Sequence, residues 1–208
     1  HHGGFGTVRV KEPMTLGHEA SGLVEAVGAG VNGVTAGDLV AVNPSQPCDS
    51  CDYCRAGMRN HCTDMRFNGS AMRFPHEQGL FRATVVVPAE RAVVMPKGTR
   101  AVEAALCEPF AVCLHAGNQA GDLAGKTVLV SGCGPIGVLA VAVAKLKGAA
   151  RILATDITRH SLDMAARMGA TDCFDVSNGT DALAPFAEGK GQVDVVFECS
   201  GNARAMAG

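Results

Sequence analysis

The first half of the chain contains short apolar runs separated by Gly, Pro and Asn. Four of these runs are LVEAV at 23–27, DLVAV at 38–42, ATVVV at 83–87 and RAVVM at 91–95. Short Val-rich stretches between turn-forming residues are typical of β-strands. We therefore predict a small all-β barrel or sandwich in this half.

After residue 125 the pattern changes to strand and helix periods in alternation. It predicts strands at 126–131, 151–155, 172–176 and 193–198, and helices at 135–147 and 159–168. Such alternation favours a doubly wound α/β domain, in which helices cover a parallel sheet. A helical pattern at 102–119 connects the two halves, so we expect one domain at 1–105 and a second at 106–208.

Charge and hydropathy exclude two classes of partner. The 208 residues carry 18 Lys and Arg against 20 Asp and Glu, which gives a net charge of −2. The basic residues do not gather in one run, as they do in proteins that bind phosphate backbones or anionic lipid. Every apolar stretch is interrupted before the roughly eighteen residues that a membrane span needs. We expect a soluble protein with no nucleic-acid and no membrane partner.

Cysteines are frequent, and four of the nine lie close together in the sequence. Their spacing is Cys48-x2-Cys51-x2-Cys54-x7-Cys62, which offers four soft ligands for a closed, tetrahedral structural zinc site. Bacterial ferredoxin motifs instead place the last two Cys three residues apart and follow them with Pro, so we favour zinc over an iron–sulfur cluster. An odd number of cysteines with this clustering indicates a reducing compartment, and we expect a cytoplasmic protein.

A glycine-rich motif, Gly132-Cys133-Gly134-Pro135-Ile136-Gly137, lies between a predicted strand and a predicted helix. Asp156 follows Gly137 by nineteen residues, at the end of the next predicted strand. This context predicts a dinucleotide site, with pyrophosphate at the helix N-terminus and the acid on the adenosine ribose. The acid favours NAD, while Arg159 keeps NADP possible. The predicted cofactor-binding residues are Gly132, Gly134, Pro135, Ile136, Gly137, Asp156 and Arg159.

The stretch GHEASGLVEAVGAGV at 17–31 resembles the zinc signature of the medium-chain dehydrogenase/reductase superfamily. The four-Cys lobe and the glycine-rich motif follow it in that superfamily's order, so the resemblance spans the chain. It implies a GroES-like β-barrel domain with a zinc lobe, followed by a Rossmann domain truncated at its end. It also implies two Zn²⁺ ions per full-length subunit and a homo-oligomer, a dimer or a tetramer.

The resemblance further implies a catalytic zinc site. His18 and Glu19 belong to the signature, and Glu108 in Cys107-Glu108-Pro109 matches the Glu-Pro of the superfamily's polyol branch. Cys107 and Cys113 are expected to be buried helix residues. The superfamily's first ligand, a Cys, precedes the signature, so we expect this chain to be a fragment that is inactive alone.

The segment TDMRFNGSAMRFPH at 63–76 resembles the L-idonate 5-dehydrogenases of the polyol branch. That resemblance implies oxidation of a sugar acid, L-idonate to 5-keto-D-gluconate. Arg66 and Arg73 in this loop suit the substrate carboxylate, because Arg forms two parallel hydrogen bonds with such a group. Equally, each is solvated or pairs with Asp64 or Glu77.

Two alternatives to a sugar-acid dehydrogenase stay open. One is a sibling enzyme, a sorbitol or other polyol dehydrogenase or an L-threonine dehydrogenase, which shares the zinc and cofactor motifs. The other is a non-catalytic domain that is held together by zinc and binds NAD(H). The second alternative requires loss of His18, Glu19 and Glu108, which are present.

Overall fold

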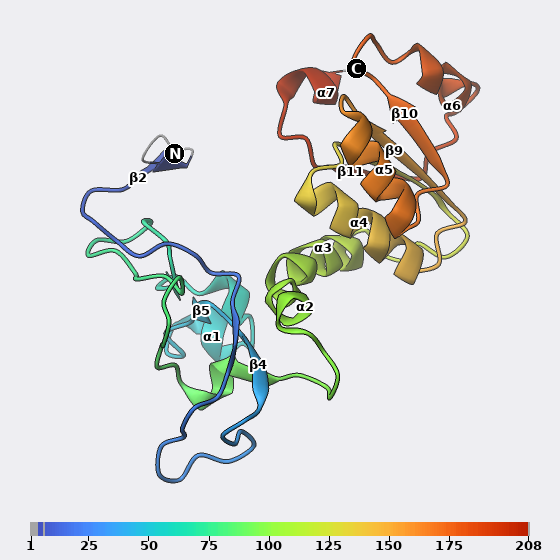
Figure 1. The fold of residues 1–208 in the computed structure, drawn as a ribbon. Helices are drawn as coiled ribbons and strands as arrows, with labels where there is room; N and C mark the ends of the chain where they lie inside the picture. The colour runs from blue at the N-terminus through green and yellow to red at the C-terminus, as the bar shows by residue number, and fades with distance from the viewer. Residues whose placement is uncertain (1–3, 6, 208) are drawn as a thin grey trace. The chain divides into compact units, whose positions relative to one another are not determined.

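The computed structural model describes residues 4, 5 and 7–207, and the chain divides between Glu108 and Pro109 into two compact units (Figure 1). The domains predicted at 1–105 and 106–208 have their boundary close to this division, and that boundary stays a prediction. Among the described residues, no helix combines the length and the apolarity that a membrane span requires.

The first unit consists of small antiparallel sheets. Strands β3 (Ser21–Leu23), β4 (Leu39–Val42) and β7 (Ala92–Val94) form a three-stranded sheet with β4 in the middle. Its register places Val40 beside Gly22 on one side and Val94 on the other. Strands β1 (Gly4–Phe5) and β2 (Val8–Arg9) form one further pair, and β5 (Ser45–Gln46) and β6 (Arg66–Phe67) another. The short helices are α1 (Asp52–Arg55), η1 (Arg59–His61) and η2 (Ala89–Arg91).

Two of the strand predictions in this unit need correction. The run 83–87 forms no strand, because no strand of the described residues pairs with its backbone, and Val86 is 98% exposed. The run 23–27 contributes only Leu23, at the end of β3. The runs 38–42 and 91–95 are confirmed as β4 and β7, whose apolar residues do find neighbouring strands.

The helix predicted at 102–119 is two helices, α2 (Ala101–Ala105) and α3 (Cys107–Gln119). Pro109 explains the break. It has no N–H to donate to the Ala105 carbonyl, and its ring is tolerated only in the first turn of a helix. The chain therefore ends one helix at Ala105 and starts a second just before the proline, which places Glu108 in the first turn of α3.

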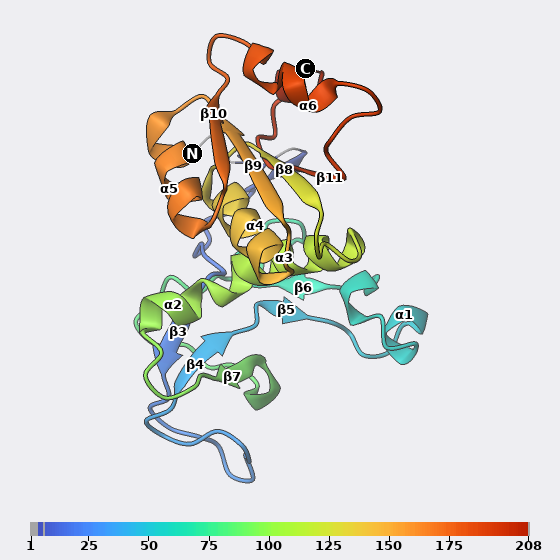
Figure 2. The ribbon, with the colours of Figure 1, turned by 90° about the vertical axis from the view of Figure 1, so that its right-hand side faces the viewer.

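The second unit contains a parallel sheet whose strand order is β10-β9-β8-β11, and Figure 2 shows the strands in that order. All four predicted strands are confirmed, as β8 (Thr127–Ser131), β9 (Arg151–Asp156), β10 (Asp172–Asp175) and β11 (Val195–Glu198). The predicted helices are α4 (Pro135–Leu146) and α5 (Arg159–Met168), and shorter helices follow at η3 (Asp181–Leu183), α6 (Ala184–Ala187) and α7 (Ala203–Ala207).

The core of this unit lies between the sheet and helices α4 and α5. Alternate strand residues such as Val128, Val130 and Ile152 are buried against Val141 and Ala165 of these helices. Strand β8 is the first of the sheet, and the chain continues to β9 on one side and later returns to β11 on the other. Ligands of doubly wound sheets bind at such a reversal, beyond the carboxyl ends of the strands.

Candidate functional site

The first unit brings together His18, Glu19 and Glu108, which are distant in sequence. One ligand atom from each side chain lies within 4.8 Å of those of the other two. His18 and Glu108 are half-buried and Glu19 is exposed. One imidazole nitrogen and two carboxylates at this spacing fit a zinc ion that keeps coordination positions open for chemistry.

Local surroundings fix the orientation of these groups. The His18 ring meets the Phe67 ring of β6 edge to face, with the centroids 5.3 Å apart. Burial raises the pKa of the Glu108 carboxyl, and the nearby Glu19 raises it further, while His18 acts in the opposite direction. Glu108 thus holds a proton more readily than an exposed glutamate does.

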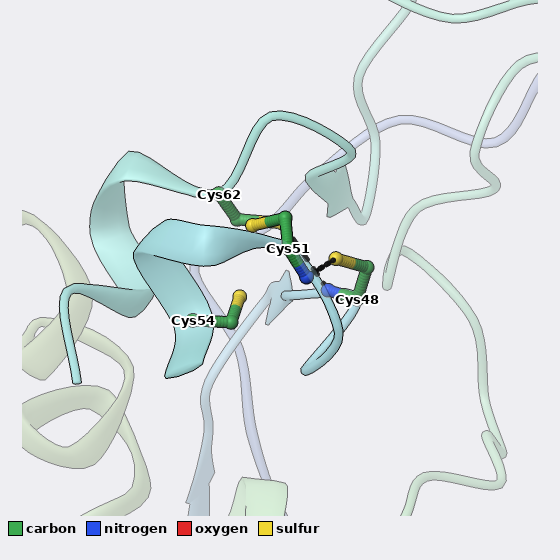
Figure 3. Close-up of side chains that lie close together, drawn as sticks. All are labelled: Cys48, Cys51, Cys54 and Cys62. Atoms are coloured by element: carbon green, nitrogen blue, oxygen red, sulfur yellow. Dashed lines mark hydrogen bonds between the residues drawn. The ribbon is translucent and has the colours of Figure 1, made fainter. Parts of the chain in front are cut away.

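The four-Cys lobe forms a second cluster in the same unit, and Figure 3 shows its side chains directed toward one another. The four sulfur atoms lie within 4.8 Å of one another. Backbone N–H groups point at them: Cys48 donates to the Cys62 sulfur at 3.2 Å, Cys51 to the Cys48 sulfur at 3.3 Å and Asp64 to the Cys62 sulfur at 3.4 Å. Such N–H groups stabilise thiolates, so the lobe fits a tetrahedral zinc ion.

The thiols of the lobe differ in acidity for local reasons. The N–H groups of Cys54 and Thr63 lower the pKa of Cys51 to about 6. Cys54 on α1 is withdrawn from water, and this raises the pKa of its thiol to about 12. A bound metal ion would remove this difference, because all four thiols must be deprotonated to bind it.

The glycine-rich motif lies between β8 and α4, at the reversal of strand order. Gly132 has a φ of +85°, and Gly134 caps α4 with Pro135 at the first helical turn. A side chain at Gly137 would overlap the carbonyl oxygen of Gly132, whereas a Cβ at Gly134 would meet nothing within 4 Å. The motif therefore packs closely on the strand side and leaves open space at the helix N-terminus, which fits a pyrophosphate.

Asp156 ends β9 beside this motif. Its carboxylate accepts hydrogen bonds from the Cys133 N–H at 2.7 Å and from the Thr158 N–H at 2.8 Å. Partial burial raises the pKa of Asp156, but these hydrogen bonds outweigh burial, and the pKa lies below its ordinary value. Arg159 forms an exposed ion pair with Asp163 on its own helix, with 2.9 Å between the charged groups.

Arg66 and Arg73 line a cavity of about 580 Å³ in the first unit. Arg66 forms an ion pair with Glu77 at 3.2 Å, and Arg73 forms one with Asp64. A substrate carboxylate would have to compete with both of these ion pairs.

The expectation that Cys107 and Cys113 are both buried is half right. Cys113 is buried in α3, but Cys107 is exposed at the start of that helix, where its thiol lies 3.9 Å from the Glu103 carbonyl oxygen.

Sequence reasoning missed the residues that hold these groups. Phe67 against His18 and Thr158 against Asp156 carry no motif. Gly69 and Gly79 offered a signal that was not used, because a glycine can mark a place where two backbones approach closely, as both do next to residues 16 and 17.

Two protein-family models match the chain. The alcohol dehydrogenase GroES-like domain matches residues 2–97, and the zinc-binding dehydrogenase family matches residues 135–207.

Three named proteins illustrate the similarity. L-idonate 5-dehydrogenase (NAD(P)(+)) of Escherichia coli K-12 is 42% identical over 200 residues, which cover 96% of this chain and 57% of that protein. Its crystal structure matches with a TM-score of 0.92 and 40% identity, over 99% of this chain and 58% of that one. D-xylulose reductase A of Aspergillus niger is 40% identical over 174 residues, 84% of this chain and 48% of that protein. Galactitol-1-phosphate dehydrogenase of Escherichia coli matches in structure with a TM-score of 0.82 and 32% identity, over 93% of this chain and 55% of that one. The chain thus spans about half the length of these relatives.

Proposed function

Because this chain belongs to the zinc-binding, medium-chain dehydrogenase family, we propose that the protein is a zinc-dependent oxidoreductase. It transfers a hydride between a secondary alcohol of a sugar acid or polyol and NAD(P). The observation that carries this proposal is the meeting of His18, Glu19 and Glu108 with their ligand atoms within 4.8 Å. The four-Cys lobe can bind its own zinc ion without these three residues, so their meeting indicates a second metal site.

Each residue of this cluster has a chemical role. A zinc ion bound there supplies Lewis acidity, which lowers the pKa of an alcohol toward neutrality. His18 binds as a neutral imidazole, oriented by its contact with Phe67. Glu108 would be a ligand or would hold the zinc-bound water, and Glu19 would be an exposed ligand or a partner that exchanges with water.

The two remaining sites support this chemistry. Cys48, Cys51, Cys54 and Cys62 hold a structural zinc ion and so fix the fold of their loop. Gly132, Gly134, Pro135, Ile136 and Gly137 receive the pyrophosphate of NAD(P), and Asp156 receives the adenosine ribose hydroxyls. We assign NAD as the preferred cofactor, because the Asp156 carboxylate repels a 2′-phosphate.

We assign L-idonate as the substrate, which is oxidised to 5-keto-D-gluconate. The name of the Escherichia coli relative and the loop with Arg66 and Arg73 support this assignment. Both arginines already pair with carboxylates, but ion pairs this exposed contribute only about 0–1 kcal/mol, so a substrate carboxylate can replace Glu77 or Asp64.

The test is turnover of L-idonate, sorbitol and L-threonine with NAD and with NADP by the natural protein that carries these residues. We expect clear preference for L-idonate and loss of turnover in His18→Ala. Arg66→Ala or Arg73→Ala should raise KM for L-idonate about 10-fold or more, and KM for sorbitol far less. Arg167→Ala, at an exposed arginine of α5 in the second unit, is the control and should change neither value.

Preference for sorbitol would favour the polyol alternative, which the similarity to D-xylulose reductase A supports. Preference for L-threonine would select the other sibling. Retention of NAD(H) and zinc without turnover of any alcohol would indicate the non-catalytic domain. The first two results refute the substrate assignment and leave the metal chemistry standing, whereas the third refutes the enzyme proposal.

We also propose that the protein is cytoplasmic and forms a homo-oligomer of two or four subunits. All nine cysteines are free, as a thiolate-bound zinc in a reducing compartment requires. Light scattering of the natural protein gives the subunit number, and a monomer would contradict the proposal.

A further inference from the structure

The segment that leads into His18 is held by the loop that follows β6. The backbone N–H groups of Gly79, Leu80 and Phe81 donate to the carbonyls of residues 15, 17 and 16, at 2.8, 2.9 and 3.0 Å respectively. In the other direction, the N–H of residue 15 donates to the Gln78 side-chain oxygen at 2.8 Å. These hydrogen bonds fix the backbone as far as the residue that directly precedes the metal ligand.

This contact is backbone against backbone, with no room for side chains. A Cβ at Gly69 would lie 2.6 Å from the carbonyl oxygen of Gly17, and a Cβ at Gly79 would overlap the backbone of Leu16. Gly17 itself has a φ of +91°, and a Cβ there would overlap the Phe81 ring. A small displacement of the loop must therefore move the backbone next to His18.

A buried arginine holds the loop from behind. Arg91 is 8% exposed, and its Nε donates to the Asn43 carbonyl at 2.8 Å. A second guanidinium nitrogen donates to the Asn68 side-chain oxygen, and the Asn68 amide nitrogen donates to the Gln78 carbonyl at 2.9 Å. A hydrogen-bonded chain thus runs from Arg91 through Asn68 and Gln78 to the segment before His18.

The charge of Arg91 is unusual in this place. Among the described residues, no carboxylate lies within ion-pair distance of it, and its guanidinium donates to two neutral oxygens. Burial lowers the pKa of its guanidinium, although arginine stays protonated in proteins. Burying such a charge costs free energy, which the hydrogen bonds to Asn43 and Asn68 and the more distant carboxylates of Glu77 and Glu90 offset.

We infer that Arg91 is a positioning residue for the metal ligand His18, and that it acts through Asn68 and Gln78. This inference rests on the proposed zinc site at His18, Glu19 and Glu108. Groups that orient a metal ligand, without touching the metal, commonly change metal affinity by about 10- to 100-fold when they are removed. The loop whose sequence distinguishes sugar-acid dehydrogenases would then also set the strength of the metal site.

The decisive variant is Asn68→Asp in the natural protein. The new carboxylate still accepts from Arg91, and indeed pairs with its charge, so the fold is retained. It has no N–H to donate, and it repels the Gln78 carbonyl. Arg91→Lys is the second variant, because a lysine keeps the charge but lacks the fork that reaches Asn43 and Asn68 together. Arg82→Lys is the matched control in the same loop.

The measurement is the rate at which a chromogenic chelator removes zinc from the protein, together with the absorption spectrum after Co²⁺ replaces the more exchangeable ion. His18→Ala identifies the phase of release that belongs to the His18 site, because that variant loses it. We expect Asn68→Asp and Arg91→Lys to accelerate this phase by about 10-fold or more and to change the Co²⁺ spectrum. The phase from the four-Cys lobe should keep its rate, as should both phases in Arg82→Lys.

Three results would overturn the inference. If both variants release the His18-site metal at the rate of the unmodified protein, Arg91 does not position His18. If only Arg91→Lys has an effect, Arg91 acts directly, for example on a ligand in the cavity that it lines, and not through Asn68. If His18→Ala removes no phase of release, the proposed zinc site itself is wrong, and this outcome is distinct from the other two.

Discussion

The carboxylate of Asp156 accepts a hydrogen bond from the backbone N–H of Cys133 at 2.7 Å. The acid that ends β9 is thereby joined to the glycine-rich motif that follows β8. In the proposed complex the same carboxylate also receives the adenosine ribose, so one side chain links the shape of the phosphate site to the choice of cofactor.

Asp156→Ser should shift cofactor preference toward NADP. The serine removes the repulsion on a 2′-phosphate and the charged acceptor for the ribose hydroxyls. We expect the ratio of kcat/KM for NADP to that for NAD to rise about 10-fold or more, the value of one charge-assisted hydrogen bond. Asp181→Ser, at an exposed acid of η3, is the control. An unchanged ratio would show that another residue selects the cofactor.

Alanine substitutions at two glycines of the motif should affect different properties, stability at Gly137 and NADH binding at Gly134. Gly137→Ala places a methyl group against the Gly132 carbonyl, and overpacking of this kind costs about 1–3 kcal/mol of unfolding free energy. At Gly134 the methyl group meets nothing within 4 Å, and the φ of −65° suits alanine.

We therefore expect Gly134→Ala to keep the thermal midpoint of the unmodified protein and to weaken NADH binding, measured by fluorescence titration. Gly137→Ala should lower the thermal midpoint, because its methyl group overpacks the fold. Normal NADH affinity in a stable Gly134→Ala protein would show that the pyrophosphate does not bind next to Gly134.

The second unit could be predicted from sequence because its signals are local. Helix α5 starts at Arg159 and ends at Met168, as its apolar period and the following Gly169 indicate. Gly169 has a φ of +121°, a conformation that glycine adopts readily. The glycine-rich motif is equally local, since strand, turn and helix follow one another directly.

The first unit could be predicted only in part because its structure depends on distant partners. The run 83–87 has the composition of a strand, but a strand also needs a neighbour, and composition does not show whether one is present. Glu108 was found through resemblance alone, since it lies ninety positions after His18 in the sequence. The chain from Arg91 to Gln78 has no motif, because each of its hydrogen bonds depends on how three loops meet.

The four-Cys lobe should lose its metal when one ligand is changed. Cys54→Ser replaces a thiolate with a weak ligand, and the three remaining sulfurs no longer close a tetrahedral site. We expect one zinc ion fewer per chain and a lower thermal midpoint, measured by metal analysis and calorimetry. Cys173→Ser, which removes an exposed thiol from β10, should keep both values. Iron with acid-labile sulfide in the unmodified protein would show that the lobe binds an iron–sulfur cluster and not zinc.

The ion pair between Arg151 and Asp172 should make stability depend on pH in acid. It joins β9 to β10 by two hydrogen bonds, each 2.8 Å long. The hydrogen bonds from Arg151 lower the pKa of Asp172 from 3.8 to about 2. A carboxyl whose pKa is depressed in the folded state adds stability above its unfolded pKa and loses that contribution as pH falls toward the folded pKa.

Asp172→Asn should therefore be less stable than the unmodified protein at pH 7, and the difference should shrink as the pH falls from about 4 to about 2. Because the Arg151 side chain is 44% exposed, solvent screening limits the difference to about 1 kcal/mol. Urea unfolding followed by circular dichroism at several pH values measures it, with Asp181→Asn as control. A difference that is the same at pH 7 and near pH 2 would mean that Asp172 stabilises the sheet through its uncharged contacts, such as the hydrogen bond from Thr171, and not through its charge.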